Sequence, residues 1–495
     1  MLKYLCVLCL VVCSAGNSLA EDSARRLSLG DAIKLAVEKN LDVRAELYNP
    51  AQFEADIQRN KAIYDPLLSL QTSYGETNSA SASVLGSPSV KTKELALDAS
   101  LSQLFWTGGT LAAFFNNAYT STNASSTLGS YWQTSAGFSL SQPLLKNFGR
   151  ENTELNILVS RLSKFGSLEH FNSRLVAVVS QVRVEYFKLY SLRETLETRK
   201  TSLELARKIL SETQARVKAG VLPAMEILNA EFGVASREKD LNDAEKAVRD
   251  QVDVINLLLQ LPSGGDLLIT DAPRRDNYDV KVQEETQKAL NRPDIRELKR
   301  NLDIAELQTR VYRNKSLPDL TLNASTALTG LDRTYPRDMD KVGTFDYPVW
   351  SIGLNLAYPL GNNAADNDYR KSRLKSEQIA LQIRSLEESA INDVRTAVRA
   401  IAASFKQIEV TDRGRAFAEE RLRSFIRKNE VGLATTKDVL DVENDLNTAK
   451  NNQVQALVDY NNAITRLWQV TGEVLERDGI RVVEGDADRL YKNIH

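Results

Sequence analysis

The sequence predicts a mainly α-helical chain that also carries β-strands of the membrane type, built as two copies of one unit. Apolar residues recur every seven positions over very long segments, which is typical of helices in coiled-coil packing. Apolar and small polar residues alternate in shorter segments, which predicts strands. Residues 42–73 repeat at 294–325 without gaps, so we expect the two halves to fold alike.

The first twenty residues are predicted to be an export signal rather than part of the fold. Lys3 supplies the positive start, a short apolar run follows, and Ser18-Leu19-Ala20 forms a small-residue cleavage pattern. All three cysteines lie within this segment, at positions 6, 9 and 13. The bulky residue before each of them argues against a lipoprotein signal. The mature chain therefore has no thiol or disulfide chemistry.

The overall composition excludes several classes of function. The formal net charge is −2, so there is no basic excess that would indicate a nucleic-acid partner. His170 and His495 are the only histidines, and no P-loop, GxGxxG or HExxH pattern is present. We therefore expect no enzyme activity, no cofactor and no metal site.

The first unit is predicted to span 21–261. A helix stops before Pro66 and becomes a strand, because the residue before proline disfavours the helical conformation. Strands occupy 66–145, and a long helical hairpin follows with its tip near Gly220. The heptad positions of this hairpin are Leu168, Leu175, Val182, Leu189, Leu196, Leu203, Leu210 and Val217, then Ile227, Val234, Leu241, Val248 and Ile255.

The second unit is predicted to span 291–472 in the same order. Its first helix stops before Pro318, strands occupy 318–360, and the helical hairpin has its tip near Gly432. The matched helical parts leave 262–290 as a connector and 473–495 as a C-terminal tail.

The strand segments fit a membrane barrel. Trp132, Phe138 and Leu140 share one strand face, opposite Ser135 and Ser139. Residues 67–145 hold few charges, which suits an apolar outer face and a wet lumen, although soluble sheets alternate as well. Four to six strands cannot close a barrel, and open edges in lipid leave backbone groups unpaired. If the strands are in a membrane, several chains must share one barrel.

The first unit carries extra length in its strand region. Residues 93–121 read as two segments around the Thr107–Thr110 turn. We predict one additional hairpin in the first unit only, which makes six strands per chain.

Taken together, the sequence resembles the TolC-like outer-membrane efflux protein family. The resemblance runs from about residue 27 to 475 and is carried by "LSLGDAIKLAVEKNLDVRA", "NRPDIRE", "VGLATTKDVLDVENDLNTAK" and "DYNNAITRLWQVTG". It implies a homotrimer with a shared transmembrane β-barrel, a long coiled-coil α-barrel across the periplasm, and a mixed belt around its middle. The connector and the tail would form most of that belt.

The resemblance also suggests a role for three acidic residues near the tips. Asp438 and Asp441 fall at the family's paired aspartate rings, and Glu226 falls at an acidic gate position of the other hairpin. Gly220 and Gly432 would be the tips that dock an adaptor. The family pattern has an arginine where this chain has Ala434 and a tyrosine where it has Asn429, so the family's gate bonds cannot be assumed. Helix capping is an alternative explanation for Asp438 with Thr435, and for Glu226, but not for Asp441.

The predicted function is that of an outer-membrane channel, the exit duct for efflux of small molecules or for type I protein secretion. The resemblance implies three kinds of partner: two further copies of the chain, a periplasmic adaptor, and an inner-membrane pump of the RND or ABC type, with outer-membrane lipid around the barrel. The alternative is a structural periplasmic coiled-coil protein without channel activity. The sequence identifies neither the cargo nor the class of pump.

Overall fold

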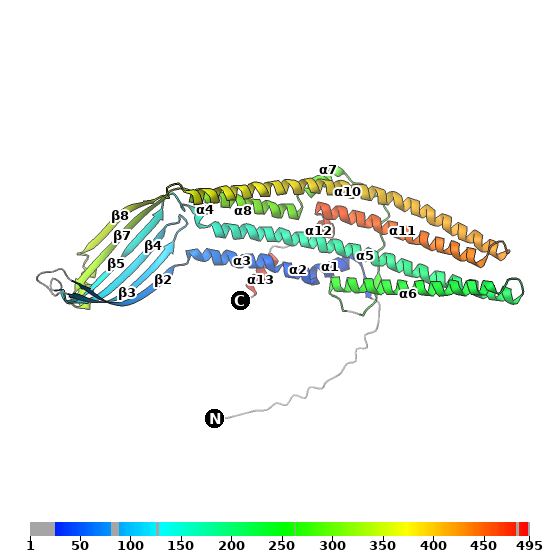
Figure 1. Ribbon diagram of the computed structural model, residues 1–495, viewed down its shortest axis with the longest axis horizontal. Helices are drawn as coiled ribbons and strands as arrows, with labels where there is room; N and C mark the ends of the chain where they lie inside the picture. The colour runs from blue at the N-terminus through cyan, green and yellow to red at the C-terminus, as the bar shows by residue number, and fades with distance from the viewer. Residues whose placement is uncertain (1–24, 81–88, 125–127, 263, 482–484, 494–495) are drawn as a thin grey trace, which may run out of the picture. The chain divides into compact units, whose positions relative to one another are not determined.

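The computed structural model describes residues 25–80, 89–124, 128–262, 264–481 and 485–493 (Figure 1). The predicted export signal, 1–20, lies outside the described residues. The chain is mainly helical with a separate six-stranded sheet, as predicted. It divides into two compact units: unit 1 takes the segment up to Arg44 with Arg174–Ala289 and Ile391–Arg481, and unit 2 takes Ala45–Ser173, Leu290–Ala390 and the C-terminal helix.

The antiparallel sheet of unit 2 follows the order β2-β3-β4-β5-β7-β8 (Figure 1). The turn at Thr107–Thr110 separates two strands, so the predicted extra hairpin is confirmed. β2 and β7 begin directly after Pro66 and Pro318, where proline ends the preceding helix. The strands are β2 Leu67–Ala80, β3 Ser89–Leu104, β4 Thr110–Thr122, β5 Ser130–Pro143, β7 Asp319–Asp332 and β8 Pro348–Ala357.

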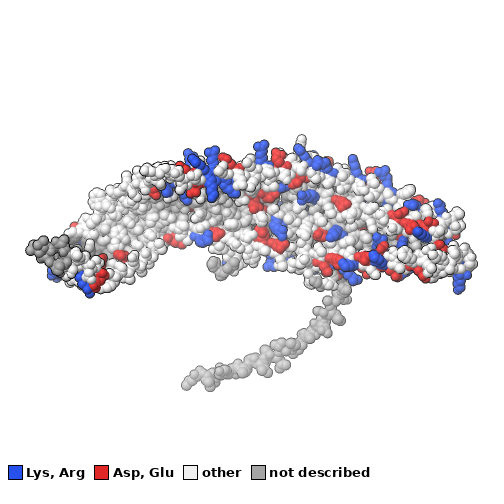
Figure 2. All heavy atoms as spheres, viewed as in Figure 1, with Lys and Arg blue, Asp and Glu red and all other residues white. Residues whose placement is uncertain are grey.

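The strand register separates the sheet into an apolar and a polar face. Because side chains alternate along a strand, paired residues lie on the same face. Figure 2 shows few charged atoms over the sheet except at one end. The apolar face holds Leu68, Leu70, Tyr74, Leu95, Leu97, Leu101, Phe115, Trp132, Phe138, Leu322, Trp350, Ile352 and Leu354. The polar face holds Ser69, Gln71, Asp98, Ser100, Asn116, Ser135, Ser139, Asn323, Ser325, Ser351 and Asn355.

A short helix, α9 (Tyr335–Gly343), lies between β7 and β8 where the sequence predicted only strands. Asp338 of this helix is fully buried and accepts a hydrogen bond from Thr134 Oγ1 on β5. A side chain on Gly330 would lie 2.2 Å from the Asp338 carbonyl oxygen. The missing side chain at Gly330 therefore lets α9 rest directly on the apolar face.

The helices of unit 2 join the sheet at the end where β2 and β7 begin. Ala305, Ile379 and Ile383 form a small core between two of them. Lys164, whose side chain is only 15% exposed, pairs with Glu54 at 2.8 Å and with Asp488 at 2.6 Å. Unit 2 contains α3 Tyr48–Lys61, η1 Ala62–Tyr64, α4 Arg150–Thr153, α8 Pro293–Lys315 and α13 Gly485–Lys492, with the first parts of two long helices.

Unit 1 consists mainly of two long helical hairpins. The first pairs α5 (Leu155–Lys218, 64 residues) with α6 (Met225–Leu259, 35 residues). The second pairs α10 (Asn363–Glu430, 68 residues) with α11 (Thr436–Thr471, 36 residues). The smaller elements are β1 Arg25–Leu27, α1 Leu29–Lys39, β6 Leu267–Ile269, α7 Val282–Ala289 and α12 Val474–Arg477, while α2 Leu41–Glu46 crosses the unit boundary.

The predicted heptad positions form the packed side of the first hairpin. Each is buried or half-buried, with the most buried positions far from the tip. The connector follows α11, because Tyr460 donates a hydrogen bond to the Asp276 carbonyl and Trp468 donates one to the Tyr278 hydroxyl. Among the described helices, none contains an apolar stretch long enough to cross a membrane.

Candidate functional site at the tips of the two helical hairpins

Both hairpin tips end their first helix in the same way. Gly220 and Gly432 have φ values of +72° and +78°, a region that favours glycine. Gly220 N donates to the Val217 carbonyl at 3.0 Å, and Gly432 N donates to the Asn429 carbonyl at 3.1 Å. The next residue in each tip donates to the carbonyl five positions back, which completes a Schellman motif. The predicted turn role of the two glycines is therefore seen in the backbone.

Asp438 caps the helix that leaves the second tip. Its carboxylate accepts hydrogen bonds from Thr435 N at 2.8 Å and Thr435 Oγ1 at 2.7 Å, and its own N–H donates to Thr435 Oγ1 at 3.1 Å. The backbone bond from Thr435, followed by the bond from its hydroxyl, lowers the pKa of Asp438 below its usual value. In the single chain, the contacts of Asp438 are therefore those of a helix cap, the alternative explanation given above for this residue.

Asp441 and Glu226 are in different surroundings. Asp441 is exposed one turn beyond Asp438 on α11. Glu226 lies in the first turn of α6, and its Oε2 is buried without a hydrogen-bond partner among the described residues. Within the described part of the chain, no hydrogen bond or ion pair joins these three acidic residues. A single chain therefore does not bring the predicted acids together.

The two tips are joined by an arginine that was not predicted from the sequence. Arg216 Nη1, near the end of α5, donates to the Asn429 carbonyl on α10 at 2.9 Å. Asn429 Nδ2 in turn donates to the Ala434 carbonyl at 3.0 Å. Asn429 and Ala434, the two positions at which the sequence is expected to differ from the family's gate residues, therefore both take part in the hydrogen bonds of the second tip.

A buried polar cluster joins the two hairpins further from the tips. Arg237 on α6 pairs with Glu443 on α11 at 2.8 Å, and their side chains are 13% and 4% exposed. Arg237 Nη2 also donates to the Leu440 carbonyl at 2.9 Å. Ser202 on α5 and Asn447 on α11 donate to the other carboxylate oxygen of Glu443. We call Arg237, Glu443, Ser202 and Asn447 the hairpin clamp.

The helices approach closely beside the hairpin clamp. A side chain on Gly233 of α6 would lie 2.6 Å from Leu440 Cδ1 on α11. Val439, Val442 and Leu446 continue the buried face of α11 around Glu443. Apart from Asn447, the partners of Glu443 come from α5 and α6, far away in the sequence, so the sequence did not predict the clamp.

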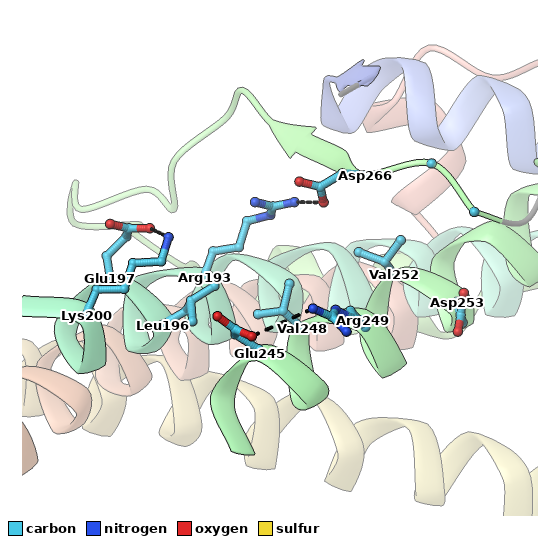
Figure 3. Close-up of a pocket in the computed structure, with 12 residues that line it drawn as sticks. Arg193, Leu196, Glu197, Lys200, Glu245, Val248, Arg249, Val252, Asp253 and Asp266 are labelled. Atoms are coloured by element: carbon cyan, nitrogen blue, oxygen red, sulfur yellow. Dashed lines mark hydrogen bonds and ion pairs between the residues drawn. The ribbon is translucent and has the colours of Figure 1, made fainter. Parts of the chain in front are cut away.

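A cavity of about 520 Å³ lies along α5, α6 and the start of the connector, away from the tips (Figure 3). Its charged side chains are largely paired with one another. Arg193 pairs with Asp266, Lys200 with Glu197 at 2.8 Å, and Arg249 with Glu245 at 3.7 Å (Figure 3). Nothing in this arrangement presents a reactive group, and the described residues contain no group of three or more His, Cys, Asp or Glu side chains that could hold a metal ion.

Comparison with known proteins agrees with this architecture. The sequence profile described as "Outer membrane efflux protein" matches residues 32–259 and 286–473. Nodulation protein T of Rhizobium leguminosarum bv. trifolii is 23% identical over 294 residues, 58% of this chain and 61% of that protein. The pyoverdine export outer membrane protein OpmQ of Pseudomonas aeruginosa is 24% identical over 402 residues, 79% of each chain. The CmeC outer membrane channel of Campylobacter jejuni shares the fold, with a TM-score of 0.65, 15% identity, and coverage of 94% of this chain and 89% of that one.

Proposed function

Because the chain belongs to the outer membrane efflux protein family, we propose that it is the exit duct through which an inner-membrane pump releases its cargo across the outer membrane. The protein is located in the outer membrane and extends into the periplasm. The observation that carries the proposal is the match of the family profile to both halves of the chain, including both helical hairpins. A sheet with one apolar and one polar face supports it, because that is the pattern of a barrel wall between lipid and water.

The proposed assembly is a homotrimer that shares one barrel and one helical tunnel. In the described strands of a single chain, β2 and β8 each pair on one side only, so the sheet has two free edges. Unpaired backbone groups in lipid cost several kcal/mol each, and pairing of β2 with β8 of the next copy satisfies them. Three chains with six strands each give a barrel of about 18 strands, within the range known for such barrels.

The proposed partners act at the hairpin tips. The exposed turns at Gly220 and Gly432 would dock a periplasmic adaptor, which links the duct to an inner-membrane pump of the RND or ABC type. The chain itself performs no chemistry, so the pump supplies the energy. The name of OpmQ refers to pyoverdine export, which favours a small-molecule cargo over a secreted protein.

The proposed entrance is a ring of carboxylates. Threefold symmetry would repeat Asp438, Asp441 and Glu226 around the axis. Like charges in a confined mouth focus the potential and attract cations. The duct would then be cation-selective, with Asp441 contributing most because Asp438 is already engaged in its cap.

Gene deletion with complementation tests the proposed function. The deletion strain should become more sensitive to antibiotics, bile salts or metals, or lose a secreted protein, and the wild-type gene should restore the phenotype. Membrane fractionation separates the duct from the structural alternative, because a coiled-coil protein without channel activity would leave the periplasm without detergent. A soluble protein and an unchanged deletion phenotype would together reject the duct.

A further inference from the structure

The extra hairpin β3–β4 has a turn that is held firmly against the end of the sheet where the helices join. Leu67 pairs with Ser102, so the turn lies at the same end as the start of β2. Phe105 N donates to the Gly109 carbonyl at 2.8 Å and closes the turn. Gly149 N donates to the Thr107 carbonyl at 3.0 Å, which fixes the turn to the segment before α4. The exit-duct proposal gives this turn no role.

The turn forms one wall of a cavity of about 600 Å³. Leu104 is the last residue of β3, Phe105 and Trp106 lie between it and the turn, and Trp106 is 60% exposed. Leu101 and Gln103 of β3 belong to the apolar face, and Phe105 is the next alternate position after the end of that strand, whereas Leu104 has the parity of the polar face. Exposed aromatic residues at the end of an apolar strand face are typical of the boundary between lipid and water.

The opposite wall of the cavity carries one charge of each sign. Arg150 Nε pairs with Glu154 Oε2 at 2.9 Å, and the Tyr64 hydroxyl donates to Glu154 Oε1 at 3.1 Å. Glu154 is 9% exposed, whereas the Arg150 side chain is 67% exposed. A guanidinium has five N–H donors, and among the described residues Glu154 is the only hydrogen-bond or ion-pair partner of this one. Arg150 therefore has donors left for an anionic group.

We propose that this cavity binds a phospholipid of the periplasmic leaflet, with its phosphate on Arg150 and its acyl chains along Phe105 and Trp106. Arginine suits a phosphate because its planar donors match two oxygens at once. The acyl chains would continue onto the apolar face at Leu101. The inference rests on the outer-membrane placement proposed above, and it gives the extra hairpin a function as an interfacial lipid site.

Native mass spectrometry of the purified full-length assembly tests the proposal. The probes are phosphatidylethanolamine, phosphatidylglycerol and diacylglycerol, which lacks the phosphate. The wild-type protein should retain both phospholipids in preference to diacylglycerol. Arg150→Gln should lower phospholipid retention roughly tenfold, since it removes a charge-assisted hydrogen bond. Trp106→Ala should lower it at least about fivefold through lost apolar contact.

Matched controls separate the site from general surface effects. Arg373→Gln removes another exposed arginine of an i,i+4 pair, and Trp350→Ala removes an exposed tryptophan elsewhere in the sheet, on its apolar face. Both should retain phospholipid as wild type does. If Arg150→Gln prevents assembly, Arg150→Lys and Trp106→Ala test the lipid site instead. Arg150→Lys should retain a reduced but measurable preference for phospholipid over diacylglycerol.

The outcomes are distinguishable from a failure of the duct itself. Equal retention by wild type, Trp106→Ala and Arg150→Gln would overturn the lipid site, as would a neighbouring protomer filling the cavity in the assembly. If that happens while the protein still conducts ions in a planar bilayer, only this inference is lost. A wild-type protein that neither conducts nor retains lipid would count against the outer-membrane duct as well.

Discussion

The Glu443→Gln substitution is expected to loosen the contact between the two helical hairpins. Glu443 is 4% exposed and receives bonds from α5, α6 and α11, so the change leaves the Arg237 charge without its counter-ion in the hairpin clamp. Removing one partner of a buried ion pair costs about 3–5 kcal/mol. The lower end applies, because glutamine keeps one oxygen acceptor and Arg237 is 13% exposed. About 3 kcal/mol shifts the equilibrium between packed and separated hairpins roughly a hundredfold.

Spin labels on the tips can measure this shift. The described residues contain no cysteine, since all three precede residue 14, so cysteines placed at Val221 and Leu433 would be labelled specifically. Both positions are exposed. In assemblies diluted with unlabelled chains, the wild type should show one narrow distance distribution and Glu443→Gln a broader and longer one.

The matched control is Asp445→Asn on the same helix. Asp445 pairs with Arg421 at 2.7 Å, but the two side chains are 53% and 45% exposed. Exposed ion pairs contribute about 0–1 kcal/mol, so this variant should keep the wild-type distribution. If Glu443→Gln also keeps the wild-type distribution, the hairpin clamp does not hold the two hairpins together.

Three further predictions concern the tips themselves. Gly220→Val and Gly432→Val each force a β-branched residue into a positive φ, so pump-dependent efflux should fall while trimers still form on native gels. Unchanged efflux in both variants would show that the tips are turns without a docking role. Asp441→Asn should weaken cation selectivity and block by trivalent cations in planar bilayers more than Asp438→Asn does. Wild-type selectivity and block in the double variant would rule out a carboxylate ring at the entrance. Because the pKa of Asp438 is lowered in the folded chain, its helix cap should be fully present above the ordinary aspartate pKa of about 4 and be lost as the pH falls through the lower, folded value. Amide exchange of Thr435 should report this loss in the wild type but not in Asp438→Asn. The same exchange profile in both proteins would contradict the prediction.

Local signals in the sequence predicted the parts of the fold that local chemistry decides. Pro66 and Pro318 mark the starts of β2 and β7, and Gly220 and Gly432 have the positive φ that their turns require. The Thr107–Thr110 turn, which has a positive φ at Gly108, located the extra hairpin correctly.

The parts that escaped prediction depend on residues far apart in the chain. The helix α9 is short, and it is held by Thr134, which is 204 positions from Asp338, and by the space above Gly330. The clamp residue Glu443 looks like an ordinary helical acid until Arg237 and Ser202 are placed beside it. Sequence spacing alone does not show which distant helix supplies such a partner.

Single-channel recording of the purified protein is the decisive measurement for the proposed exit duct. We expect detergent-solubilised trimers to insert into a planar bilayer, to produce discrete conductance steps, and to favour cations over anions by reversal potential. Stable protein that inserts into no bilayer, produces no conductance steps and remains monomeric without detergent would rule out the exit duct.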